Sequence, residues 1–145
     1  MRWRSRVLVP ATVFTVVVGA GYAIDAGASD EQPTLGPGLV TVAVDIEHSE
    51  FSIDRLAVHA GTTVRFVVRN DDPINHELVT GGDDVHARHA RGTERRHPPV
   101  PGEVSVGPGE TGVTFFAFDE PGTYEFACHL PGHVEYGMRG EITVR

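Results

Sequence analysis

From residue 39 onward, hydrophobic positions alternate with polar ones in short runs, a pattern typical of β-strands with one buried face. Glycine and proline turn signals separate the runs at intervals of about 8–12 residues. The pattern predicts an all-β sandwich or barrel of about seven to eight strands. The expected strands are residues 39–46, 62–70, 75–80, 103–106, 111–118, 122–129 and 140–145, and residues 51–61 are expected to hold one further short strand that ends at Gly61.

One segment, residues 81–102, breaks this spacing and is expected to be a long loop insertion, which in a compact domain is usually functional or disordered. It carries four arginines against three acidic residues, and it contains His86, His89 and His97. A short helix would fit within residues 85–96. Its histidines at 86 and 89 would then share one helical face and could bind a second metal ion. We favour the simpler interpretation of a polar, solvated loop.

The N-terminal residues 1–28 have the composition of a signal peptide. Three arginines precede the apolar stretch at residues 7–24, and the small residues at 26–28 fit an A-x-A-like cleavage site. We therefore expect an exported protein, periplasmic or secreted, that begins at Ser29. If residues 7–24 stay uncleaved, they would tether the chain to the outer face of a membrane, although the stretch is short for a spanning helix. Residues 29–38 are expected to be a linker.

The charge of the remaining chain is strongly negative. From Ser29 onward there are nine arginines, no lysine and nineteen acidic residues, a net charge of −10 with neutral histidines. Such a balance argues against nucleic acid as a partner. The length from residue 39 to residue 145 suits one domain with one hydrophobic core.

Cys128 is the chain's single cysteine, so no disulfide can form within the chain. A lone thiol outside the cytoplasm must be buried and inert, catalytic, or bound to a metal. His133 follows five residues later, after a Pro-Gly turn that can bring its ring back toward the sulfur. Met138 follows after another five residues. A thiolate, an imidazole and a thioether are a donor set that suits copper.

A second imidazole would complete a trigonal His₂Cys set with an axial methionine. His76 is the best candidate, because it follows a proline turn and begins a strand, and Asn75 could brace it by a hydrogen bond. His129 should point away from the metal, because neighbours on a strand face opposite sides. It is expected to be exposed or hydrogen-bonded. The two other histidines, at 48 and 59, are expected to be exposed.

The stretch GTYEFACHLPGHVEYGMRGEITV closely resembles the C-terminal signature of cupredoxins, the plastocyanin/azurin-like blue copper proteins. The upstream stretch FSIDRLAVHAGTTVRFVVRNDDPINHELV is also similar to that family. The resemblance covers about residues 39–145, with 81–102 as an insertion. It implies a cupredoxin-like Greek-key β-sandwich that holds one mononuclear type 1 copper. It also implies four metal ligands, which are His76, Cys128, His133 and Met138.

These features favour a small electron carrier in which copper cycles between Cu(I) and Cu(II). We expect redox proteins as its partners, and we expect it to be a monomer. The alternative is a copper-binding, delivery or homeostasis protein without a relay role, whose basic loop would acquire copper or dock a partner. An enzyme is not expected, because four ligands would saturate the single site. A dinuclear copper centre would need two cysteines, and a methionine ligand argues against zinc.

Overall fold

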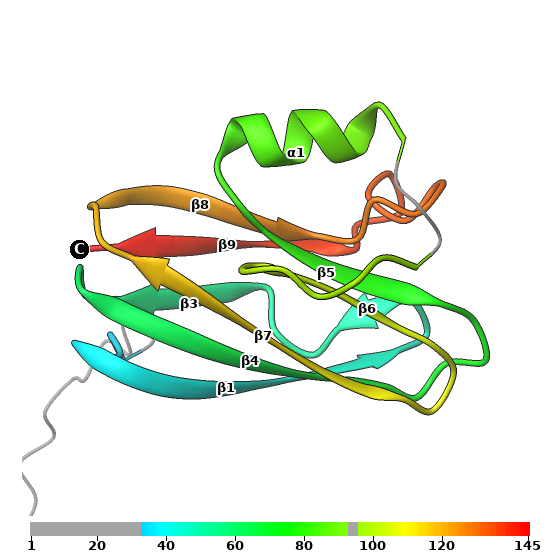
Figure 1. Ribbon diagram of the computed structural model, residues 1–145, viewed down its shortest axis with the longest axis horizontal. Coiled ribbons are helices and arrows are strands. Elements are labelled where there is room, and N and C mark those ends of the chain that lie inside the picture. The colour runs from blue at the N-terminus through cyan, green and yellow to red at the C-terminus, as the bar shows by residue number, and fades with distance from the viewer. Residues whose placement is uncertain (1–32, 93–95) are drawn as a thin grey trace, which may run out of the picture. The chain divides into compact units, whose positions relative to one another are not determined.

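Two β-sheets packed face to face form the body of the protein, as the computed structural model shows (Figure 1). The structure describes residues 33–92 and 96–145. The expected signal peptide lies outside the described residues. Among the described residues, no helix has the length and the apolar character needed to cross a membrane.

Nine strands and one helix are described, and most strands fall where the alternation predicts them. The all-β prediction is therefore confirmed. In chain order the elements are β1 (Gly38–Glu47), β2 (Glu50–Phe51), β3 (Arg55–Val58), β4 (Thr62–Asn70), β5 (His76–Gly81), α1 (Asp83–Ala90), β6 (Glu103–Val106), β7 (Thr111–Phe118), β8 (Gly122–Ala127) and β9 (Arg139–Val144).

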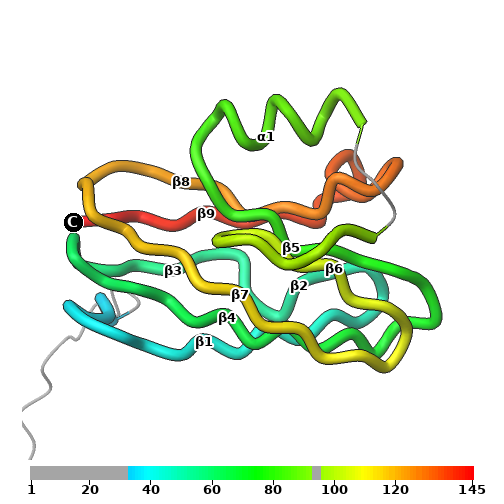
Figure 2. The backbone as a smooth tube through the Cα atoms, viewed as in Figure 1, coloured from blue at the N-terminus to red at the C-terminus, as the bar shows by residue number. Residues whose placement is uncertain are grey.

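The strands divide into a four-stranded sheet in the order β2-β1-β4-β7 and a five-stranded sheet in the order β3-β9-β8-β5-β6. In the first sheet β1 runs parallel to β4, and β7 runs antiparallel to β4. In the second sheet β8 lies between β5 and β9 and runs antiparallel to both. This order brings the start of β5 and the end of β8 to the same end of the sandwich, where the orange segment after β8 coils (Figure 2).

The hydrophobic core lies between the two sheets. On β4 every second residue from Thr62 to Asn70 is buried, which is the period expected of a strand with one inward face. The largest fully buried side chains are phenylalanines from different strands: Phe66, Phe118 and Phe126. The core also includes Cys128 and Met138, so the candidate metal centre is continuous with it.

Three segments differ from the sequence-based expectation. The segment 51–61 does not hold one short strand ending at Gly61, because Phe51 ends β2 and the chain pairs again, with β9, only over β3 from Arg55 to Val58. The described end of the expected linker also lies on the body of the protein, because Leu35 pairs with Val58 and packs against the core. The expected loop at 81–102 contains α1, the short helix considered for it, beginning at Asp83.

Helix α1 lies on the outer face of the five-stranded sheet, against β5 and β8 (Figure 1). Acidic Asp83 and Asp84 occupy its first turn and basic Arg88 and His89 its last turn, which complements the helix dipole. Its inward face buries His86 and His89. The interpretation of these two histidines as part of a solvated loop is therefore wrong.

Candidate metal centre

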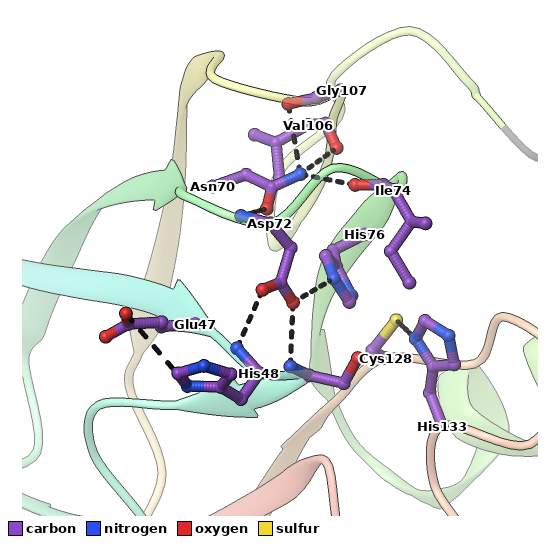
Figure 3. A network of polar contacts seen from close by, with 11 residues as sticks. Glu47, His48, Asn70, Asp72, Ile74, His76, Val106, Gly107, Cys128 and His133 are labelled. Carbon is purple, nitrogen blue, oxygen red and sulfur yellow. Dashed lines mark hydrogen bonds and ion pairs between the residues drawn. The ribbon is translucent and has the colours of Figure 1, made fainter.

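Three of the predicted site residues come together at one end of the sandwich. One nitrogen each of His76 and His133 and the sulfur of Cys128 lie within 4.8 Å of one another. The Nδ1 atom of His133 is 3.2 Å from the Cys128 sulfur, and the centroids of the two imidazole rings are 4.9 Å apart. Figure 3 shows the three side chains converging from two separate segments of the chain.

The fourth predicted residue, Met138, is fully buried in the same part of the core. Its backbone closes the loop that follows β8. The amide of Met138 donates to the carbonyl of His133, and the amide of Cys128 donates to the carbonyl of Met138. The amide of His133 in turn donates to the carbonyl of Leu130, which forms the Pro-Gly turn expected from the sequence. The spacing of five residues thus corresponds to two successive hydrogen-bonded turns.

The chemistry of Cys128 in the metal-free protein is that of a neutral thiol. Burial raises its pKa from 9.0 to about 12, although the backbone amides of Glu77 and Leu130 act in the opposite direction. The side chain is fully buried. Because the thiolate is the form that binds metal, a cation entering the site must displace this proton.

His76 is the fully buried imidazole of the site, and Asp72 braces it. The Nε2–H of His76 donates to Oδ2 of Asp72 at 2.9 Å. Burial lowers the pKa of His76, and the charge of His133 adds to this effect, while Asp72 opposes it. The bracing group is therefore Asp72 and not Asn75, which sequence reasoning favoured. The sequence signal for this role is a carboxylate, Asp72, in the turn just before the candidate ligand His76, and sequence reasoning overlooked it.

The turn that carries Asp72 is organised by the buried side chain of Asn70. Its amide donates to the carbonyls of Ile74, Val106 and Gly107, at 2.7, 3.2 and 3.0 Å, and its oxygen accepts from the amide of Asp72 at 2.9 Å. Figure 3 shows these contacts joining the end of β4, the end of β6 and the start of β5. The sequence did not single out Asn70, which looks like an ordinary strand-end residue.

A buried carboxylate, Glu77, ties the two ligand-bearing segments together. It follows His76 on β5, and its Oε1 accepts from the amide of His129, the residue after Cys128, at 2.9 Å. The start of β5 and the end of β8 are thereby joined next to the site. This residue too escaped sequence reasoning, because a glutamate on a short strand is usually exposed.

The remaining histidines lie apart from this site. His48 and His59 are exposed, as predicted. His129 is half-buried and hydrogen-bonded, which agrees with the expectation that it faces away from the metal. Its Nε2–H donates to Nδ1 of His86 at 2.9 Å, because Nε2–H of His86 donates to the Glu125 carbonyl at 3.0 Å. Burial and then the neighbouring His86 and His89 lower the pKa of His129 to about 4.

The inner face of α1 makes further polar contacts with the sheet. His89 Nε2 lies 3.1 Å from Oε2 of Glu103, which also pairs with Arg88, and His97 Nε2 lies 3.4 Å from Oε2 of Glu77. These contacts account for the burial of His86 and His89, which the sequence left open as a second metal pair. The histidines of α1 therefore fasten the helix to β6 and β8, and His97, which lies beyond the helix, contacts Glu77 on β5.

The donor set at the end of the sandwich fits copper. Among the described residues, Nδ1 of His76 is buried and has no hydrogen-bond partner, and His76 belongs to the cluster with the Cys128 sulfur and His133. Two imidazoles, a thiol and a nearby thioether are soft and borderline donors, whereas Mg²⁺ and Ca²⁺ prefer oxygen. A two-sheet sandwich with this site at one end defines the class of cupredoxin-like copper proteins.

Comparison with known proteins agrees with this class. The chain matches the model of the copper binding proteins of the plastocyanin/azurin family over residues 39–145. The chain therefore belongs to this family, and the metal of the family is copper. The cupredoxin fold and the copper cofactor expected from the sequence are thus confirmed.

Two kinds of relative are found among curated proteins. The copper-resistant cuproprotein CopI of Rubrivivax gelatinosus is 40% identical over 93 residues, which cover 62% of this chain and 56% of that protein. Auracyanin-B of Chloroflexus aurantiacus is 34% identical over 109 residues, which cover 65% of this chain and 46% of that protein. The matches thus span about half the length of each of these relatives.

Solved structures give the same result. The chain resembles auracyanin B with a TM-score of 0.58 and 30% identity, over 78% of this chain and 93% of the other. It resembles auracyanin A, described as a "blue" copper protein of Chloroflexus aurantiacus, with a TM-score of 0.59 and 26% identity, over 74% of this chain and 100% of the other.

Proposed function

We propose that this chain is an exported mononuclear type 1 copper protein that acts as a small electron carrier. The proposed ligands are His76, Cys128 and His133, with Met138 as the weak axial ligand. The observation that carries the proposal is the convergence of two imidazole nitrogens and one thiol sulfur within 4.8 Å at one end of a β-sandwich. This is the ligand set of blue-copper electron-transfer sites.

The surroundings of the site suit electron transfer. Bound copper supplies one-electron chemistry between Cu(II) and Cu(I), and the chain's residues hold the metal and exclude water. His76, Cys128 and Met138 are fully buried, whereas His133 is half-buried and is therefore the proposed ligand nearest to solvent. The exposed apolar side chain of Tyr136 lies on the same loop. We infer that a redox partner would exchange electrons through the edge of His133.

The proposed domain bounds, location and partners are those expected from the sequence. Residues 1–28 would direct export and be removed, residues 29–38 would link, and residues 39–145 would form the copper domain. The protein would act outside the cytoplasm as a monomer, with redox proteins as partners and no nucleic acid. No enzymatic activity is proposed, because four ligands leave no position for a substrate. Family membership supports copper binding, and it is compatible with electron transfer and with copper delivery.

The first experiment is a visible absorption spectrum of the purified protein loaded with Cu(II), followed by cycles of chemical reduction and reoxidation. We expect an intense charge-transfer band from a copper–thiolate bond that disappears and returns with each cycle. Cys128→Ser should abolish the band, and His59→Ala, which changes an exposed histidine, should preserve it. A pale copper complex whose Cys128 still reacts with thiol reagents would contradict the proposed site.

The second candidate function is copper delivery or homeostasis, and the similarity to copper-resistant cuproproteins favours it. The two functions differ in whether the metal leaves the protein. An electron carrier retains its copper through repeated redox cycles in the presence of a Cu(I) chelator. Copper delivery would be favoured if the oxidised protein shows the blue band and then loses most of its copper to the chelator after one reduction.

A further inference from the structure

We propose that Asp72 is a positioning residue of the copper site, which holds His76 in one tautomer and adds a negative charge behind it. The inference rests on the ligands proposed above. Asp72 would act through His76 and would not touch the metal. Its consequence would be a site that binds Cu(II) more strongly relative to Cu(I) than the ligands alone would give.

The tautomer of His76 follows from the contact between the two side chains. A carboxylate at this distance accepts a hydrogen bond, so the proton of the neutral ring must lie on Nε2, which is 2.9 Å from Oδ2 of Asp72. The other nitrogen, Nδ1, then carries the lone pair. This is the buried nitrogen that has no hydrogen-bond partner among the described residues. Asp72 thus leaves the lone pair on the side of Cys128 and His133.

Asp72 is itself held in place by an unusual backbone turn between β1 and β2. The amides of His48 and Ser49 donate to its two carboxylate oxygens, each at 2.7 Å. Both residues have positive φ angles, 56° and 58°, which residues other than glycine seldom adopt. Two successive amides in this conformation form a concave anion-binding nest. Figure 3 shows the carboxylate between this turn and the His76 ring.

The nest keeps Asp72 ionised although the residue is only 7% exposed. Its two carboxylate oxygens accept three hydrogen bonds, from the amides of His48 and Ser49 and from Nε2–H of His76, and such bonds favour the ionised form. An anionic partner raises the basicity of a metal-bound imidazole more than a neutral carbonyl would. The more highly charged ion, Cu(II), gains more from this charge than Cu(I) does.

Asp72→Asn tests the charge, because asparagine has nearly the same shape and its oxygen can still accept from His76. We expect this variant to keep the blue band. We expect its ratio of Cu(II) to Cu(I) affinity to fall by about tenfold, which corresponds to a potential about 59 mV higher. The matched control is Asp71→Asn. It removes the same charge one residue away, where Asp71 is half-exposed and pairs with Arg69 at 2.6 Å.

The control should change the affinity ratio by less than about twofold, because its charge is screened by water. Equal shifts in the two variants, or no shift in Asp72→Asn, would overturn the proposal. A wild-type protein without the blue band would instead contradict the proposed ligands, so the two failures are distinguishable.

A second measurement needs no metal, and its decisive result comes from the wild type. Nitrogen chemical shifts and long-range couplings of the His76 ring in the copper-free protein report its tautomer directly. We expect a neutral ring protonated on Nε2, and a mixture of tautomers in Asp72→Ala. A wild-type ring protonated on Nδ1, or a mixture in the wild type, would overturn the proposal even if the variants failed to fold.

Discussion

The buried thiol of Cys128 makes the stability of the metal-free protein depend on pH in the alkaline range. Its pKa in the folded protein is about 12, against 9.0 for the ordinary thiol. A shift of about three units corresponds to at most about 4 kcal/mol, at about 1.4 kcal/mol per unit. Because the folded pKa is the higher one, this stability is fully present below pH 9 and is lost progressively between pH 9 and about 12. At pH 10 the loss is about 1 kcal/mol.

Denaturant unfolding of the copper-free protein at pH 8 and at pH 10 measures this effect. Cys128→Ala is the control, since alanine cannot titrate while the other ionisable groups stay the same. Between the two pH values the free energy of unfolding of the wild type should fall by about 1 kcal/mol more than that of the variant. Equal losses in the two proteins would refute the assignment of Cys128 as a buried thiol with a raised pKa.

The same thiol makes copper uptake depend on pH. At pH 7–8 the Cys128 thiol is protonated, so each Cu(II) that binds through this sulfur should release one proton. The apparent affinity should therefore rise about tenfold per pH unit in this range. Proton release measured with an indicator dye in weakly buffered solution tests this, and Cys128→Ser should release no such proton. Copper binding to the wild type without proton release would contradict the thiolate ligand.

Two further predictions concern the scaffold. Gly140→Ala should lower the free energy of unfolding by about 1–3 kcal/mol, because its Cβ would lie 2.1 Å from Cζ of Phe126; an unchanged denaturation midpoint would contradict this packing. His86→Ala should destabilise the protein by about 1–3 kcal/mol, because it leaves the Glu125 carbonyl and His129 without their partner. Copper content measured by mass spectrometry should stay at one per chain in His86→Ala, as in the exposed-site control His59→Ala, and a lower content would indicate that His86 binds metal.

The strands were largely predictable because their alternation is regular and glycine and proline residues bound them. Residues 103–106 and 111–118 are strands with the predicted limits. The division of residues 51–61 was not predictable, because it depends on distant partners. Ser52 donates its amide to the carbonyl of Asp45 on β1, and the Asp54 carbonyl accepts from the amide of Glu141 on β9. Neither contact can be predicted from the hydrophobic and polar pattern of residues 51–61.

The candidate ligands were predictable because they lie in one short motif and one turn, but their supports were not. Asp72 is held by the amides of residues 48 and 49, which are more than twenty residues away in sequence. The burial of His86 and His89 was missed for a related reason. Polar residues on a short helix are expected to face water, and the sheet supplies their partners, among them Glu103 and the Glu125 carbonyl.

The supports explain how one site could serve both oxidation states of copper. Three separate connections hold the proposed ligands: Asp72 fixes the ring of His76, Glu77 joins β5 to the chain beyond Cys128, and backbone hydrogen bonds link Met138 to both Cys128 and His133. Because Glu77 on β5 accepts from the amide of His129, a movement of the loop that carries Cys128, His133 and Met138 away from His76 would break this hydrogen bond. A site held in this way keeps nearly the same geometry when copper gains an electron. In the proposed electron carrier, a redox partner would contact the half-buried His133, and the buried ligands would not have to move.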